Sequence, residues 1–140
     1  MSVKLEFVDT NVLLYAYDHN EPIKQRQAEA LLTDLWHRRA GCLSIQVLQE
    51  FYVNATRKLS RPLELATAKE LVRDYALWIV HLPTSSDLLS AIELHERYQV
   101  SFWDAMILQS ALELGCALLW SENLNPGQSF VGLTVQSPFR

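Results

Sequence analysis

Short apolar runs alternate with longer segments of helical periodicity along this chain. Four or five runs have the length and composition of β-strands, at residues 3–8, 41–45, 78–82, 117–121 and, as the fifth, 131–135. Between them, apolar residues recur at helical spacing in residues 12–17, 23–39, 46–58, 63–77, 88–98 and 102–115. Strands that alternate with helices are typical of an α/β fold in which helices cover both faces of a mainly parallel sheet.

The composition indicates one globular domain. The chain has 140 residues, 49% hydrophobic and 20% charged, which is typical of a single domain, here expected to span residues 1–140. Glu6 and Asp9 interrupt the apolar run that a signal peptide needs, and no apolar stretch is long enough to cross a membrane. We therefore expect a cytoplasmic protein with no membrane partner. Cys42 and Cys116 lie in apolar stretches, so we expect reduced core residues.

The net charge restricts how this protein could bind nucleic acid. The chain carries 16 acidic and 12 basic residues, which gives a formal net charge of −4. A protein of this charge does not attract a nucleic acid through its overall field. Any function on nucleic acid requires a local site.

Two aspartates stand at unusual positions. Asp9 directly follows the first apolar run, so we expect its side chain at the carboxyl edge of the sheet, where α/β proteins bind ligands. Asp104 falls on the apolar stripe of residues 102–115, where a carboxylate is costly unless it is paired, capped or bound to a metal. Local structure offers an alternative for each: Asp9 caps the next helix, and Asp104 closes a capping box with Ser101.

Glu50 and the residues at the end of the fourth strand are further candidates for binding a metal ion through oxygen atoms. Glu50 follows the second strand, although it lies off the apolar stripe of its helix, a position that by itself favours a solvated side chain. Ser121 ends the fourth strand, and Glu122 and Asn123 come next. If these strands are neighbours, the acids converge at one edge of the sheet. Clustered carboxylates select hard cations such as Mg²⁺ or Mn²⁺, which can promote phosphodiester hydrolysis.

Basic residues follow Glu50 along the chain. Arg57, Lys58 and Arg61 could contact the phosphates of a nucleic acid beside the acids, and the alternative is a solvated helix end. The four histidines are dispersed, and the chain has no G-x-S-x-G motif or P-loop. The residues therefore favour carboxylate chemistry over nucleophilic catalysis by a side chain.

Four segments in order resemble the PIN-domain ribonucleases, and within them the VapC-like toxins of bacterial toxin–antitoxin pairs. These are D-T-N-V-L-L-Y from Asp9, S-I-Q-V-L-Q-E-F-Y with Glu50, S-F-W-D-A-M-I with Asp104, and L-W-S-E-N-L-N with Glu122 and Asn123. Each motif is weak alone, whereas four in order at family-like distances are specific. The similarity runs from about Val3 to Val135.

The resemblance implies a three-layer α/β/α PIN-like fold and a metal-dependent endoribonuclease that cuts RNA with Mg²⁺ or Mn²⁺. Asp9, Glu50 and Asp104 would hold the metal and act as the catalytic acids. Asn123 and Glu122 are further candidate ligands, and Asn11 and Ser121 are supporting polar residues. The expected partners are an RNA substrate, a cognate antitoxin and a second copy of this chain in a homodimer.

One departure from the family pattern keeps a second function open. The family often places a fourth acid where this chain has Asn123 or Asn125, and asparagine offers an oxygen without the charge. A PIN fold with a weakened metal site could serve as a binding module with little nuclease activity. Two other classes lack their required residue: a haloacid dehalogenase needs an aspartate at Asn11, and a response-regulator receiver needs one near His81.

Overall fold

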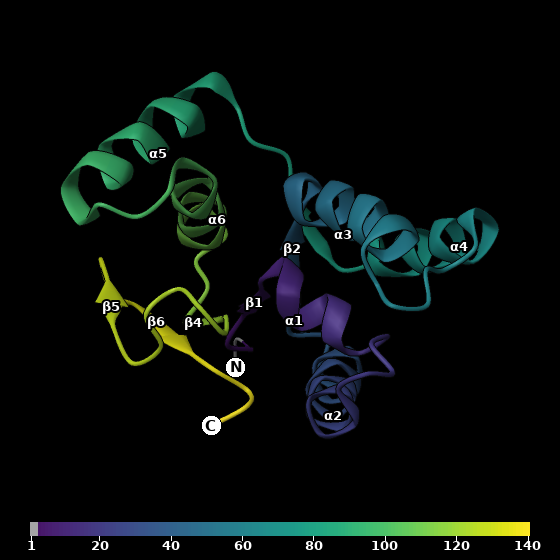
Figure 1. Ribbon diagram of the computed structural model, residues 1–140. Helices are drawn as coiled ribbons and strands as arrows, with labels where there is room; N and C mark the ends of the chain where they lie inside the picture. Colours follow the sequence, from purple (N-terminus) through teal and green to yellow (C-terminus); the bar gives the residue numbers. More distant parts are fainter. Residues whose placement is uncertain (1–2) are drawn as a thin grey trace.

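The computed structural model describes residues 3–140, so the first two residues of the expected 1–140 domain lie outside the described part. Figure 1 shows the order of its helices and strands, which are β1 (Glu6–Val8), α1 (Thr10–Tyr15), α2 (Pro22–Arg38), β2 (Gly41–Ser44), α3 (Ile45–Arg57), α4 (Leu65–Tyr75), β3 (Ile79–His81), α5 (Ser85–Tyr98), α6 (Phe102–Glu113), β4 (Leu118–Trp120), β5 (Ser129–Phe130) and β6 (Leu133–Gln136).

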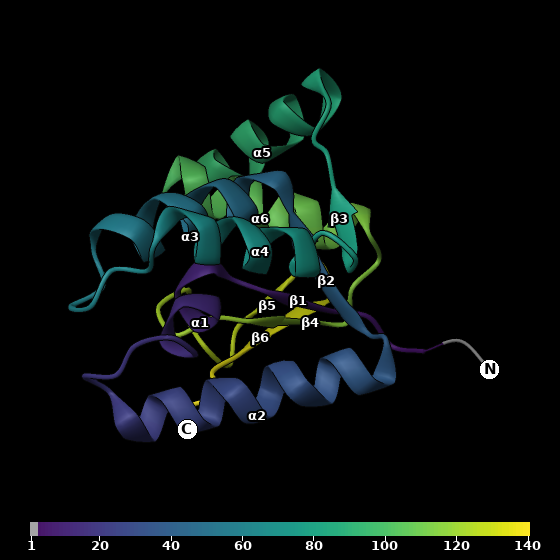
Figure 2. The same cartoon turned by 90° about the vertical axis from the view of Figure 1, so that its right-hand side faces the viewer.

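The sheet is mainly parallel, as the alternation of strands and helices predicts. Its strand order is β3-β2-β1-β4-β6-β5, and only the β5–β6 pair is antiparallel. In Figure 2 the strands form a middle layer, with α2 below it and α5 and α6 above it. The predicted three-layer α/β/α fold is thus confirmed, with a sheet of six strands where four to five were expected.

The additional strand is β5, which lies just before the strand predicted over residues 131–135; that prediction corresponds to β6, and its first two residues form a turn instead. Val131 and Gly132 have φ angles of 52° and 87°, so the chain turns there and separates β5 from β6. Two successive residues with positive φ are typical of a two-residue hairpin turn. The pattern concealed this turn because valine, a β-branched residue, rarely adopts positive φ.

Large apolar side chains from the sheet and from the helices fill the core. Phe7 of β1, Phe51 of α3 and Phe130 of β5 are fully buried. Cys42 and Cys116 are free and buried, which confirms the expectation of reduced core cysteines. Within residues 3–140, no helix combines the length and apolar character needed to cross a membrane.

The topology brings the ends of β1 and β4 together. The two strands are parallel neighbours, and the amide N–H of Asp9, just after β1, donates to the carbonyl oxygen of Trp120 at a distance of 2.9 Å. On the other side of β1, β2 ends at Ser44, whose hydroxyl accepts from Val47 N–H and caps α3. Chain segments that are far apart in the sequence therefore meet at the carboxyl edge of the sheet.

Candidate active site

Asp9 is held from two directions at the end of β1. Its Oδ1 accepts from the backbone N–H of Thr10 at 2.7 Å, so Asp9 caps α1 as the local alternative proposed. Its Oδ2 accepts from the Ser121 hydroxyl at 2.9 Å, across 112 positions of sequence. Ser121 is buried and Asp9 is half-buried. One carboxylate oxygen of Asp9 therefore caps α1, and the other accepts the hydrogen bond from Ser121 at the end of β4.

Glu50 reaches the same region from α3. Its Oε1 accepts from the Thr10 hydroxyl at 2.7 Å, and its Oε2 is 3.4 Å from the side-chain nitrogen of Gln46. Periodicity alone favoured a solvated side chain, but Glu50 is half-buried because α1 packs against α3. Thr10 is a site residue that the sequence reasoning missed, although it lies between Asp9 and Asn11 in the first motif.

Asp104 lies in the first turn of α6, and only half of its expected capping box is present. The Ser101 hydroxyl accepts from the backbone N–H of Asp104 at 3.1 Å. In α5, by contrast, the Thr84 and Asp87 side chains complete a full capping box. No described residue donates a hydrogen bond to the Asp104 carboxylate, so this half-buried group remains available for another role.

The charges of Glu50 and Asp104 act on the Asp9 carboxyl group. Burial raises the pKa of Asp9 from its ordinary value of 3.8 to about 6, while the hydrogen bonds from Ser121 and Thr10 oppose this rise. The negative charges of Asp104 and Glu50 raise the pKa of Asp9 further. No cationic side chain contributes to the shift. Asp9 thus lies in negative surroundings in which a bound cation would be stabilised.

The donor set suits a hard divalent ion, although the ligands are not preassembled. Carboxylate and hydroxyl oxygens are the donors that Mg²⁺ and Mn²⁺ favour. Within residues 3–140, no group of three or more His, Cys, Asp or Glu side chains is arranged to hold a metal ion. The hydrogen bond from Thr10 explains part of this, since it fixes one oxygen of Glu50. A bound metal would compete with that hydrogen bond.

Glu122, two residues after β4, is bound by side chains of α1 and α2. Glu122 accepts from the Tyr15 hydroxyl at 2.8 Å and from Lys24 Nζ at 2.5 Å. Burial opposes its ionisation, but the hydrogen bonds from Lys24 and Tyr15 outweigh burial and hold the pKa of this carboxyl below its ordinary value. Both of its oxygens are thus occupied toward α1 and α2. The side chains of Asn11 and Asn123 are exposed and line a cavity beside α1.

The three basic residues are exposed, and none of them forms an ion pair within the described part of the chain. Arg57 and Lys58 lie at the end of α3, and Arg61 lies in the loop that follows. Of the three, only Lys58 lines the cavity that contains Asn11 and Asn123. Their positive charges are thus free to meet an anionic ligand.

A serine, a histidine and an aspartate also meet in a place that the sequence did not predict. The Ser110 hydroxyl is 2.9 Å from His81 Nδ1, and His81 Nε2 is 3.2 Å from an Asp87 oxygen. This geometry resembles a nucleophilic triad. However, Ser110 is only 1% exposed, so a substrate cannot reach its hydroxyl. We interpret the contact as a link between β3 and the α5–α6 pair.

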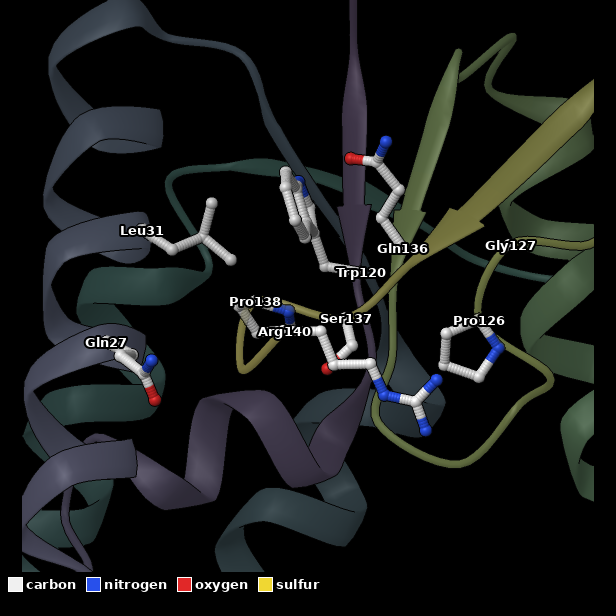
Figure 3. A pocket seen from close by; sticks show the side chains of 9 residues that line it. All are labelled: Gln27, Leu31, Trp120, Pro126, Gly127, Gln136, Ser137, Pro138 and Arg140. Carbon is white, nitrogen blue, oxygen red and sulfur yellow. The ribbon is translucent and has the colours of Figure 1, made fainter.

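A second cavity lies between α2, the end of β4 and the chain at the end of β6 (Figure 3). Its volume is about 540 Å³, and Figure 3 shows Trp120 between Leu31 of α2 and Gln136 of β6. The indole N–H of Trp120 donates to Glu6 at 2.8 Å, which fixes the ring. None of the three candidate acids lines this cavity. The cavity that contains Asn11 and Asn123 is not lined by the three acids either, but Asn11 follows Asp9 by two positions and Asn123 follows Ser121 by two positions.

Comparisons with known proteins identify the family and agree with the fold. Residues 7–125 match the PIN domain family. The chain is 33% identical over 93 residues to ribonuclease VapC23 of Mycobacterium tuberculosis, and this match covers 66% of the chain and 71% of the relative.

Solved structures show the same fold at low identity. A toxin–antitoxin complex from Klebsiella pneumoniae matches with a TM-score of 0.68 and 17% identity, over 95% of this chain and 97% of the other. VapC20 of Mycobacterium tuberculosis, a sarcin–ricin loop cleaving toxin, matches with a TM-score of 0.63 and 20% identity, over 86% and 91%. VapBC-1 of nontypeable Haemophilus influenzae matches with a TM-score of 0.66 and 17% identity, over 97% and 99%. Together with the sequence matches, these likenesses place the chain in the PIN-domain family, among the VapC ribonucleases.

Proposed function

We propose that this protein is a Mg²⁺- or Mn²⁺-dependent endoribonuclease that acts in the cytoplasm as the toxin of a toxin–antitoxin pair. The observation that carries the proposal is the geometry at the ends of β1 and β4, where Ser121 and Thr10 hold the Asp9 carboxylate and Thr10 also donates to Glu50. The negative charges of Asp104 and Glu50 act on Asp9 with no cationic side chain to offset them, which is consistent with this geometry. Such a group of oxygens at the carboxyl edge of an α/β sheet suits a divalent cation. Membership of the VapC ribonucleases supplies the substrate class.

In this proposal Asp9, Glu50 and Asp104 hold the ion. A Mg²⁺ or Mn²⁺ ion held there would supply positive charge that favours hydrolysis of the phosphodiester by water. Ser121 and Thr10 donate hydrogen bonds to Asp9 and Glu50, so they position these carboxylates. The exposed cations Arg57, Lys58 and Arg61 contact the RNA phosphates. Glu122 is absent from this set because Lys24 and Tyr15 occupy its oxygens.

Cleavage of single-stranded RNA by the purified protein tests the reaction. After removal of metals with a chelator, we expect no cleavage, and we expect Mg²⁺ or Mn²⁺ to restore it. Asp104→Asn should abolish the restored activity without unfolding the protein, whereas Asp74→Asn, at an exposed position of α4, should retain it. Equal cleavage by the parent and by Asp104→Asn would show that the three acids are not the active site.

The proposal also includes an antitoxin and a homodimer as partners. Two of the structures that share this fold are toxin–antitoxin assemblies by name, the complex from Klebsiella pneumoniae and VapBC-1. We expect expression of the chain alone to arrest bacterial growth and co-expression of the neighbouring small reading frame to relieve the arrest. Growth that continues under expression of the active chain would contradict the toxin role. Sedimentation of the purified protein tests the homodimer.

A further inference from the structure

A polar cavity of about 330 Å³ lies between α1, α3 and the segment after β4. We call it the asparagine pocket, because Asn11, Asn54 and Asn123 line it from these three places. Its volume is at the lower end of the range that small ligands occupy, about 300–1,000 Å³, which suits a ligand of the size of one nucleotide.

The pocket adjoins the proposed active site through three chain segments. Asn11 follows Asp9 by two positions, and Asn123 follows Ser121 by two positions. On α3, Glu50, Asn54 and Lys58 are spaced four residues apart, so they share one face of the helix. This face leads from the acids, through the pocket, to an exposed cation.

The amide groups of the pocket are free to bind a ligand. The side chains of Asn11 and Asn123 are exposed, that of Asn54 is half-buried, and none of the three amides forms a hydrogen bond with residues 3–140. Each amide offers a carbonyl acceptor and an NH₂ donor. The same mixture of acceptors and donors lies along the edge of a nucleobase, and proteins read unpaired RNA bases through such edges.

The other lining residues complete a site for a base and its phosphate. Leu14 and Leu59 supply apolar surface for the flat face of a base. Lys58 is exposed and unpaired among the described residues, so it can meet a phosphate. Two acids, Glu122 and Asp18, also line the pocket. The pairing of Glu122 with Lys24 reduces its repulsion of RNA, and Asp18 accepts a hydrogen bond from the backbone N–H of Asn20.

We propose that the asparagine pocket binds one unpaired base of the RNA next to the bond that is cut, and that Asn54 helps to select which base enters. Lys58 binds the phosphate of the same nucleotide. This inference takes RNA as the ligand from the proposed function. It adds that the asparagine pocket is where a preference for RNA sequence arises. The selection of a base by amide hydrogen bonds predicts a preference at one RNA position rather than along the whole strand.

Binding measurements in the absence of cleavage test this inference. We would use the Asp104→Asn protein and single-stranded RNA heptamers that differ by one base at each position in turn, with fluorescence anisotropy as the readout. We expect affinity to depend on the base at one position by about tenfold. Addition of Asn54→Ala should remove most of this preference. Lys58→Ala should weaken all heptamers alike and reduce the salt dependence of log Kd by about 0.7.

The matched control is Asn20→Ala, at an exposed asparagine in the α1–α2 turn that does not line the pocket. This variant should keep the base preference. Equal affinity for all bases, no binding, or an unchanged preference in Asn54→Ala would overturn the inference. The two proposals can be refuted separately. If the parent protein cleaves RNA but binding shows no base preference, only the proposed role of the asparagine pocket is refuted. If the protein selects a base but never cleaves RNA, only the proposed nuclease activity is refuted.

Discussion

Asp9 shows how one side chain can stabilise local structure and still weaken the fold through its charge. It caps α1, yet its pKa is about 6 in the folded protein against an ordinary value of 3.8. The folded state therefore binds a proton more tightly than the unfolded state does. By linkage, ionisation of Asp9 costs stability progressively as the pH rises from about 4 to about 6, and the full cost is present above pH 6.

The variant Asp9→Asn lacks this ionisation, so its stability relative to the parent should improve as the pH rises. We expect the difference in unfolding free energy to move in favour of the variant by about 1–3 kcal/mol between pH 4 and pH 8. Urea denaturation in the presence of a chelator, at several pH values, measures it. Parallel pH profiles for the two proteins would contradict the raised pKa.

Ser121 also affects the pKa of Asp9, in the direction opposite to burial. Its hydroxyl donates to Asp9 and lowers the pKa of that carboxyl. Ser121→Ala removes this hydrogen bond, so the pKa of Asp9 should rise above about 6. If cleavage requires ionised Asp9, the acidic limb of the pH–rate profile should move upward by about one pH unit. Ser86→Ala, at an exposed position of α5, is the matched control and should leave the limb in place.

At the scale of elements, periodicity located all six helices and the four strands β1 to β4, because each has a contiguous apolar pattern. The position of Asp9 after a strand and of Asp104 on an apolar stripe also marked them as unusual. The contact between Thr10 and Glu50 joins residues 40 positions apart, and the meeting of His81 with Ser110 joins residues 29 apart. Such contacts depend on how helices pack, and local patterns do not encode this packing.

The hairpin between β5 and β6 was concealed by a residue that fits its conformation poorly. Val131 has a φ of 52°, which is costly for a β-branched side chain. Asparagine tolerates this region and precedes glycine in the most favourable two-residue turns. We expect Val131→Asn to raise the unfolding free energy by about 1 kcal/mol in urea denaturation. Val131→Thr retains the β-branch and should give no such gain.

For the whole molecule, an aromatic cluster joins helices that are separate in the sequence. Trp36 of α2, Phe51 of α3 and Tyr75 of α4 pack together with Trp78, with ring centroids 5.4 to 6.1 Å apart. Trp78 lies directly over Gly41 at the start of β2, where an added Cβ would come within 2.3 Å of the ring. The packing of three helices against the sheet therefore depends on the absence of a side chain at residue 41.

Gly41→Ala should consequently force Trp78 out of its place. We expect a loss of about 1–3 kcal/mol in unfolding free energy, the usual cost of overpacking, measured by urea denaturation. A double-mutant cycle with Trp78→Leu provides the control: if the clash is the cause, Gly41→Ala should cost less in the Trp78→Leu protein. Additive costs would show that the destabilisation arises elsewhere.

The pairing of β1 with β4 also determines when the proposed nuclease can first work during its synthesis. Asp9 leaves the ribosome early, but its hydrogen-bond partner Ser121 lies 112 residues later, and β4 itself must insert beside β1 before that contact can form. Long-range parallel pairing of this kind is a late step in folding. A nascent or prematurely terminated chain therefore contains the acids without the strand that orders them. On this topology, the proposed site is finished only after β4 and Ser121 have been synthesised.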